Sequence, residues 1–333
     1  MTEIKSTTGS PNTAILGLGA YRPSLLVPNA DVIEAIDSSD EWIQQRSGIK
    51  TRRWATPEET LPMMTLAAAR DALDSSGVAA EQIDCVIVAT VTYLTQTPAL
   101  APTIAYELGT NQAAAFDISA ACAGFSHGLA LASDMVKGGS AQYVLVIGAE
   151  RLSDLLKSTD RGTAFIFADG AGAAVVGPSE TPGIGPVVWG SDGEQSELIK
   201  QSEPWTDIVA SANPEMPYLS MQGAQVFRWA AFTMAKVAQQ ALDKAGITAD
   251  QLDVFVPHQA NMRIIDAMAR AMSLPDHVAV ARDIADQGNT SAASVPLALH
   301  RLMEEGEAKS GDIALLIAFG AGLAYAAQVV TVP

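Results

Sequence analysis

The sequence predicts an α/β protein built from two related halves, each with a mainly parallel sheet, and with a helical layer shared between the two sheets. Two observations support this fold class. The chain has 333 residues, of which 48% are hydrophobic and 17% charged, so it is long enough for two domains and apolar enough for a large core. Apolar strands also alternate with helices, which is typical of mainly parallel sheets covered by helices on their faces.

An internal repeat supports the division into halves. Residues 71–84 (DALDSSGVAAEQID) align with residues 240–253 (QALDKAGITADQLD) at an offset of 169, and seven of the fourteen positions are identical. Residues 122–135 match residues 290–303 at an offset of 168, and both runs are predicted helices that follow a small-residue turn. Both helices are rich in Ala, Ser and Gly, so we expect them to pack closely in a shared central layer.

In chain order, four segments are expected. Residues 1–13 are polar and predict a loose tail, residues 14–178 the first half, residues 179–222 a junction with a loop-like insert, and residues 223–333 the second half. The expected strands include residues 85–89, 143–147, 254–256, 313–318 and 323–332. The last two divide an uncharged stretch that is otherwise long enough to imitate a membrane span, because Phe319-Gly-Ala-Gly322 interrupts it with a turn.

Charge and cysteine content exclude several functions. The formal net charge of −17 has the wrong sign for general binding to nucleic acid or to an anionic membrane. Two cysteines and four histidines without a C-x-x-C motif predict neither a disulfide framework nor a zinc site. The polar N-terminal segment lacks the pattern of a signal peptide, so we expect a cytoplasmic protein.

Cys122 is a candidate nucleophile. It lies in Asp117-Ile-Ser-Ala-Ala-Cys-Ala-Gly-Phe125, at a predicted turn from a strand into a helix. The partial positive charge at a helix N-terminus should lower the pKa of its thiol toward neutrality. The alternative is a small buried hydrophobe, which is what we expect of Cys85 inside an apolar strand.

His258 and Asn289 are the polar residues best placed to assist it. His258 follows the strand residues Val254-Phe-Val-Pro257, and the carboxyl ends of strands are where open α/β sheets place their chemistry. Asn289 precedes the second-half helix that mirrors the Cys122 helix, so the pseudo-symmetry of the halves should bring it toward Cys122. Each has a structural alternative, a buried histidine and a helix cap respectively.

At these motifs the chain resembles the β-ketoacyl-acyl carrier protein synthase III family, which has the thiolase-like fold. The resemblance extends from about Ala14 to the C-terminus and is carried by Ala-Ala-Cys-Ala-Gly-Phe, Val-Pro-His-Gln-Ala-Asn, Gly-Asn-Thr-Ser-Ala-Ala-Ser and Ser-Asp-Glu-Trp-Ile. It implies a duplicated thiolase-like fold, in which two related halves with mixed sheets form a layered α-β-α-β-α arrangement. The resemblance implies a Cys-His-Asn triad of Cys122, His258 and Asn289 as well. It also implies a decarboxylating Claisen condensation of an acyl-CoA primer with malonyl-acyl carrier protein, which gives 3-ketoacyl-acyl carrier protein and starts type II fatty acid synthesis.

The resemblance assigns further residues. The oxyanion would be held by the backbone N–H groups of Cys122 and Ala321, although many family members have Gly-Gly-Gly where this chain has Gly320-Ala-Gly322. Primer size would be set by Thr97, in a loop that closes the pocket of the partner in a homodimer. The coenzyme A contacts would be Trp42, Arg46, Arg161, Gly223 and Asn261, and the carrier-protein docking residues would be Arg228, Arg263 and Arg270. The resemblance implies no metal and no cofactor, since the coenzyme A thioester is a substrate.

Two other functions stay open at this point. A priming ketosynthase of an aromatic polyketide pathway shares the same motifs and is difficult to separate by sequence. Cys, His and Asn in this order also occur in papain-like cysteine proteases, but the half-chain repeat and the mid-chain position of Cys122 argue against a protease. A non-catalytic homologue would be expected to have lost Cys122.

Overall fold

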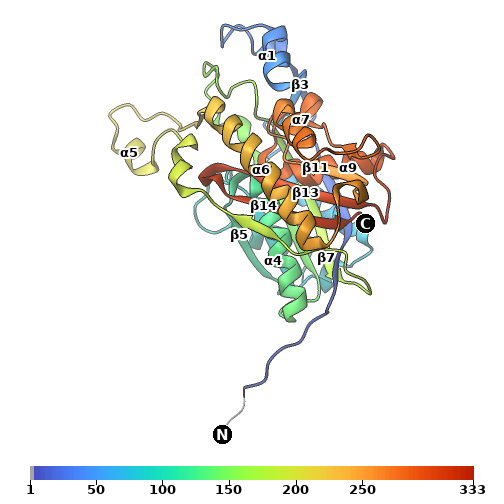
Figure 1. Ribbon diagram of the computed structural model, residues 1–333. Helices are drawn as coiled ribbons and strands as arrows, with labels where there is room; N and C mark the ends of the chain where they lie inside the picture. The colour runs from blue at the N-terminus through green and yellow to red at the C-terminus, as the bar shows by residue number, and fades with distance from the viewer. Residues whose placement is uncertain (1–3, 111) are drawn as a thin grey trace.

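Two mixed sheets form the framework of the protein, whose computed structural model describes residues 4–110 and 112–333 (Figure 1). The first sheet has the order β1-β7-β6-β4-β5 and the second the order β8-β14-β13-β11-β12. In both, the last three strands are parallel and the first two run antiparallel to their neighbours. The first sheet consists of β1 (Thr13–Tyr21), β4 (Cys85–Ala89), β5 (Ala114–Ile118), β6 (Val144–Arg151) and β7 (Asp169–Pro178). The second consists of β8 (Val188–Gly190), β11 (Val254–Pro257), β12 (Ala279–Val280), β13 (Ile313–Phe319) and β14 (Tyr325–Thr331). The predicted duplication with mixed sheets is confirmed.

Helices separate and cover the sheets in the predicted layers. The outer face of the first sheet packs against α2 (Leu61–Ser76) and α3 (Leu100–Leu108), and that of the second packs against α6 (Gly223–Ala245) and α7 (Met262–Ala271). Between the sheets lie α4 (Gly124–Gly138) and α9 (Ser294–Glu304), whose apolar residues share one core with both sheets. Figure 1 shows α6 lying across β13 and β14.

Local sequence explains where the repeated helices begin and end. The Thr60 side chain accepts a hydrogen bond from the backbone N–H of Met63 and thereby caps α2. Helices α2 and α6 both end at a glycine with positive φ, Gly77 at 68° and Gly246 at 74°, as the repeat predicted. The strand that follows each helix, β4 or β11, is buried along its whole length, as expected for a parallel strand covered on both faces.

The structure corrects the register of the second repeat. Turns of 3-10 helix, η3 (Ala121–Ala123) and η7 (Ser291–Ala293), precede α4 and α9, and the first residue of each has positive φ. The structural offset is therefore 170 rather than 168, and Cys122 corresponds to Ala292 and not to Thr290. Leu-Ala-Leu occurs in both helices, so sequence identity favoured a wrong register where the geometry of the turn defines the correct one.

The segment expected to be loop contains regular structure. Strand β8 completes the second sheet, and β9 (Ile199–Gln201) pairs with β10 (Leu219–Met221) around α5 (Trp205–Ala210). The prediction of loop was therefore wrong for these short elements, whose three to six residues give little periodicity.

The remaining elements join the two halves or flank the fold. A hairpin of β2 (Leu25–Pro28) and β3 (Thr51–Trp54) encloses α1 (Asp40–Ser47), which contacts α7, and α8 (Ile284–Gln287) packs against β3. Residues 4–12 form neither helix nor strand, and the backbone of Gly9 and Ser10 bonds to the end of α4. In the described ranges, no helix is long and apolar enough to cross a membrane.

Candidate active site

One cavity of about 530 Å³ brings together most of the residues singled out in the sequence. It opens at the junction of the halves and is lined from both of them. The predicted residues in its wall are Trp42, Arg46, Cys122, Arg161, Gly223, His258, Asn261, Arg263, Asn289 and Ala321. Thr97, Arg228 and Arg270 do not line it.

Cys122 lies in η3, between β5 and α4. The preceding residue, Ala121, has a φ of 46°, a left-handed conformation that costs a non-glycine residue about 1–2 kcal/mol. Such local strain is typical of turns that present a reactive side chain. The side chain of Cys122 is half-buried, and part of its surface faces the cavity.

The thiol of Cys122 is not activated in the way the sequence predicted. Burial above all, together with the negative charge of Glu150, raises the pKa of the thiol to about 12, although a hydrogen bond with the Ser291 side chain acts in the opposite direction. Desolvation of the thiolate therefore outweighs the favourable position before α4. At neutral pH the residue is a thiol, and it needs a base to become a nucleophile.

His258 is the candidate for such a base. It follows β11 and is only 3% exposed, and its backbone N–H donates a hydrogen bond to the carbonyl of Ile317. Its ring packs edge-on against that of Phe319, with 5.5 Å between the ring centres. Burial lowers its pKa to about 3, so the imidazole is neutral. Its Nδ1 lies 2.6 Å from the hydroxyl oxygen of Ser294 at the start of α9, which leaves Nε2 for chemistry.

Asn289 is held rigidly just before η7. Its backbone N–H donates to the carbonyl of Ile166 at 2.9 Å, and its carbonyl accepts from the N–H of Ala168 at 2.8 Å. Its side-chain Oδ1 accepts the backbone N–H of Ser291 at 2.8 Å, a local cap of the turn. The cap uses the oxygen, so the amide Nδ2 is the group that can donate to a ligand in the cavity.

Two residues of this site were missed from the sequence, Ser291 and Glu150. Ser291 lines the cavity beside Cys122, and its hydroxyl donates to Oε1 of Glu150 at 3.1 Å. Glu150 is a fully buried carboxyl on β6, and burial raises its pKa to about 7. Glu150 could have been found as a carboxylate within an otherwise apolar strand. Ser291 could have been found from its position in the Asn-Thr-Ser motif.

A close backbone contact brings the two predicted oxyanion donors together. A Cβ atom placed on Gly320 would lie 2.5 Å from the backbone nitrogen of Cys122, so only glycine lets these two backbone segments approach this closely. Ala321, the next residue, begins η8 (Ala321–Leu323) and lines the cavity. The N–H groups of Cys122 and Ala321 therefore belong to neighbouring turns at one end of the cavity.

Four of the predicted coenzyme A residues contact one another in the cavity wall: Trp42, Arg46, Arg161 and Asn261. The guanidinium carbon of Arg161 lies 4.8 Å from the centre of the Trp42 ring and that of Arg46 lies 5.7 Å from it. The guanidinium of Arg161 therefore lies over the face of the indole at a distance that leaves no room for an adenine between them, so the guanidinium would have to move away to admit one. Asn261 caps α7 through Oδ1 and donates from Nδ2 to the carbonyl of Arg46 at 3.0 Å, which joins α7 to α1.

The predicted docking and primer residues are more dispersed. Arg263 is exposed on α7 and lies over the ring of Phe227 at 4.8 Å, at the cavity wall, while Arg270 and Arg228 are exposed farther along α7 and α6. Asp266 forms an ion pair with Arg282 at 2.8 Å, and not the local pair with Arg263 that the spacing suggested. Thr97 is exposed in the loop after β4.

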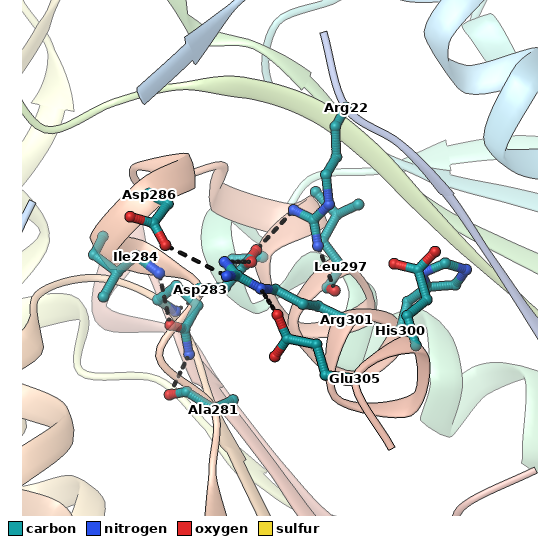
Figure 2. Close-up of polar contacts among 12 residues, drawn as sticks. Arg22, Ala281, Asp283, Ile284, Asp286, Leu297, His300, Arg301 and Glu305 are labelled. Carbon is teal, nitrogen blue, oxygen red and sulfur yellow. Dashed lines mark hydrogen bonds and ion pairs between the residues drawn. The ribbon is translucent and has the colours of Figure 1, made fainter. Parts of the chain in front are cut away.

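A charged network anchors the segment that leads to Asn289 (Figure 2). Asp283, which is buried, accepts from Arg22 of the first half at 2.9 Å and from Arg301 of α9 at 3.2 Å. Arg301 also reaches Asp286 and Glu305. Gln259, next to His258, bonds to the same segment through the carbonyl of Ala281 and the N–H of Ile284. His258 and Asn289 are thus tied to one scaffold.

No group of three or more metal-ligating side chains with suitable geometry occurs within residues 4–110 and 112–333. Both carboxylate oxygens of Glu150, which contacts the cavity-lining Ser291, are engaged in hydrogen bonds.

Comparison with known proteins identifies relatives over the whole chain. Sequence profiles of the family described as 3-oxoacyl-[acyl-carrier-protein (ACP)] synthase III match residues 116–193, and profiles of its C-terminal region match residues 242–332. A β-ketoacyl-[acyl-carrier-protein] synthase III from Streptomyces glaucescens is 60% identical over 100% of both chains. A mycobacterial enzyme of the same name from Mycobacterium marinum is 52% identical over 100% of this chain and 99% of its own.

Solved structures agree with the sequence relatives. A priming β-ketosynthase of a polyketide biosynthetic pathway has a TM-score of 0.96 at 48% identity, with 98% of each chain covered. The 3-oxoacyl-[acyl-carrier-protein] synthase III of Aquifex aeolicus has a TM-score of 0.88 at 39% identity, over 96% of this chain and 100% of that chain. From the fold, the cavity and these relatives together, the chain belongs to the 3-oxoacyl-[acyl-carrier-protein] synthase III family of condensing acyltransferases.

Proposed function

We propose that this enzyme condenses an acyl-CoA primer with malonyl-acyl carrier protein, with loss of CO₂, to give 3-ketoacyl-acyl carrier protein. The observation that carries the assignment of residues is the single cavity into which Cys122, His258 and Asn289 all face. Cys122 comes from the first half and the other two from the second, so the reaction centre is formed at the seam between the halves.

In the first half-reaction Cys122 takes the acyl group. The neutral imidazole of His258 accepts the thiol proton at Nε2, and the thiolate attacks the thioester carbonyl. The C–S bond to coenzyme A then breaks, and the proton leaves with coenzyme A as its thiol. The N–H groups of Cys122 and Ala321 stabilise the oxyanion, and one such donor is worth roughly 10²–10³ in rate.

In the second half-reaction His258 and Asn289 act as donors. Both bond to the thioester carbonyl of the malonyl group, so loss of CO₂ leaves a stabilised enolate, whose carbon attacks the acyl group on Cys122 and frees the sulfur. His258 accepts in the first step and donates in the second, and the Ser294 hydroxyl supports both tautomers because it can donate to Nδ1 or accept from it.

Substrate binding follows the arrangement of the cavity wall. Trp42 with Arg161 and Arg46 would hold the nucleotide of coenzyme A, and Gly223 and Asn261 would flank the pantetheine chain. The acidic carrier protein needs a local positive surface on a chain of net charge −17, which Arg228, Arg263 and Arg270 would supply. We propose that the reaction uses no metal and no further cofactor.

We also propose a homodimer in which Thr97 closes the partner's primer pocket. Strand β5 is at the end of its sheet, and its Phe116 is 38% exposed, while Tyr106 of α3 is 81% exposed. An exposed edge with large apolar side chains is typical of a surface that pairs with another chain. The small side chain of Thr97 would admit branched or longer primers as well as acetyl.

A priming ketosynthase role is the second candidate, because the structural relative at 48% identity carries that description. It uses the same residues and the same steps, and differs in the pathway that takes up the product.

The assignment is tested by mass spectrometry after incubation with acyl-CoA. One acyl group should be found on the peptide of Cys122, it should be absent in Cys122→Ala, and it should persist in Cys85→Ala, since Cys85 is fully buried in β4. Asn289→Ala should still be acylated but should fail to release CO₂ from malonyl-acyl carrier protein. Acylation of Cys85, or equal loss of both steps in Asn289→Ala, would contradict the proposed roles.

A further inference from the structure

Glu150 is a buried carboxyl beside the nucleophile to which the mechanism above gives no role. It lies near the end of β6 with no exposed surface, opposite Gly170 of β7. A carboxyl group is rarely buried unless its oxygens are hydrogen-bonded. Glu150 meets this condition with contacts to two segments that line the cavity.

The two oxygens of Glu150 have different partners. Oε2 accepts three hydrogen bonds from the end of β4, from the hydroxyls of Thr90 at 3.3 Å and Thr92 at 2.7 Å and from the backbone N–H of Val91 at 3.1 Å. Oε1 accepts one, from the hydroxyl of Ser291 at 3.1 Å. Because Oε2 already has three donors, a proton added to this carboxyl will reside on Oε1, the oxygen that faces Ser291.

Ser291 interacts with both Glu150 and Cys122. The backbone N–H of Ser291 is bound to Asn289, and its hydroxyl has one proton to donate. Toward ionised Glu150 the hydroxyl donates to Oε1, as the structure shows. If Oε1 is protonated it becomes the donor, and the Ser291 hydroxyl is then free to donate to the sulfur of Cys122, where its hydrogen bond favours the thiolate.

We propose that Glu150 is a positioning residue that sets the reactivity of Cys122 through Ser291. Ionised Glu150 holds the Ser291 hydroxyl and opposes the thiolate by its charge, whereas neutral Glu150 releases the hydroxyl to the sulfur. This inference deepens the proposed function, since it rests on Cys122 being the nucleophile.

Few other ionisable groups act on this pair. The end of β4, β7 and η7 present uncharged groups to Glu150, and η3 presents Cys122. Arg151, the next residue on β6, pairs with Asp154 at 3.3 Å, and Asp169 of β7 is held by Ser153 and Ala55. His258 lines the same cavity but is neutral. Within the part of the chain that the structure describes, Cys122 is therefore the ionisable group coupled to Glu150.

The test is the rate at which iodoacetamide alkylates Cys122, followed on its own peptide across neutral and alkaline pH. In Glu150→Gln the amide oxygen will face the three donors of β4 and the amide nitrogen will donate to Ser291, which mimics the neutral acid. Alkylation should become faster, by about tenfold for each unit by which the thiol pKa falls. Ser291→Ala should slow it at the lower end of this pH range, where neutral Glu150 leaves the hydroxyl free to donate to the thiolate.

The double variant Glu150→Gln/Ser291→Ala separates a relay from a simple charge effect. Coupling through Ser291 predicts a smaller gain from Glu150→Gln when the hydroxyl is absent. Additive effects would overturn the relay, as would unchanged or slower alkylation in folded Glu150→Gln. Glu59→Gln is the matched control: Glu59 is also buried and accepts from Tyr21, Ser24 and Thr56, but it lies outside the cavity. Its substitution should leave the alkylation of Cys122 unchanged.

The unmodified enzyme gives an independent reading should Glu150→Gln fold poorly. Alkylation by a thiolate normally becomes tenfold faster with each pH unit below the thiol pKa. Because Glu150 ionises near pH 7 and its charge then opposes the thiolate, the increase per pH unit should be less than tenfold around neutrality. A full tenfold increase there would refute the coupling. Alkylation needs no acyl-CoA, so these results are distinct from failure of the proposed function, which would show as acylation that survives in Cys122→Ala.

Discussion

Replacement of Gly320 by Ala should damage the oxyanion site without unfolding the protein. An added Cβ would lie 2.5 Å from the backbone nitrogen of Cys122, about 0.9 Å short of the 3.4 Å at which ordinary van der Waals contact begins. The obstructing atom belongs to the backbone, so no side-chain rotation can relieve the contact. The turn of Cys122 and the turn of Ala321 must therefore move apart.

The size of the effect follows from hydrogen-bond geometry. Donors to an oxyanion work at 2.7–3.1 Å, and a donor displaced by a further 0.9 Å no longer forms a useful hydrogen bond. Loss of one donor costs roughly 10²–10³ in rate, so Gly320→Ala should slow acylation of Cys122 by acetyl-CoA by about that factor. Single-turnover quenched flow with intact-mass detection measures this step directly.

Gly138→Ala is the matched control, because a Cβ at Gly138, near the end of α4, meets nothing within 4 Å. It should acylate at the normal rate and unfold at the same or a slightly higher temperature. Equal acylation rates in the two variants would show that the close contact with Cys122 has no bearing on the oxyanion donors. A slow but fully unfolded Gly320→Ala would not count in its favour, so thermal unfolding is measured on the same samples.

Three further predictions concern stability and docking. Burial raises the pKa of Glu150 to about 7 from 4.5, so the folded chain binds the extra proton between these values, and the free energy of unfolding should fall by about 3 kcal/mol as pH rises through that window. Glu150→Gln should abolish this fall. If the free energy of unfolding measured in urea has the same pH dependence in both proteins, Glu150 does not cause the fall. Asp283→Asn should lower the free energy of unfolding by about 2–3 kcal/mol, because the buried carboxylate joins two arginines, whereas Asp207→Asn on the exposed α5 should have no effect in the same urea titration. Arg228→Glu should raise KM for malonyl-acyl carrier protein and leave acylation by acyl-CoA unchanged, since Arg228 lies outside the cavity wall; an unchanged KM at low salt would remove it from the docking surface.

The fold could be predicted from the sequence because the halves repeat each other in both pattern and residue identity. Gly77 and Gly246 end equivalent helices, and the apolar strands that follow them are the centres of equivalent sheets. The register of α4 and α9 could not be predicted, because it depends on the left-handed turns at Ala121 and Ser291. A glycine in the sequence can indicate a positive φ, whereas an alanine or a serine does not.

The candidate site was predictable in its members and not in its electrostatics. The strand-end and turn positions of Cys122, His258 and Asn289 were visible in the motifs, and the cavity contains all three. A helix N-terminus suggested an acidic thiol, but desolvation is a property of the packed environment and raises the pKa instead. The role of Glu150 in the site could not be predicted for the same reason, because its hydrogen-bond partners at the end of β4 and in η7 are 58 to 141 residues away in sequence.

The central layer of α4 and α9 has a consequence for how the chain folds. Each helix belongs to one half but shares a single apolar core with both sheets, so a half in isolation would leave one face of its sheet and of its helix in water. We therefore expect one cooperative unfolding transition rather than two. A chain cut between β7 and β8 should yield two fragments that aggregate when expressed separately and regain structure and acylation only when they are refolded together.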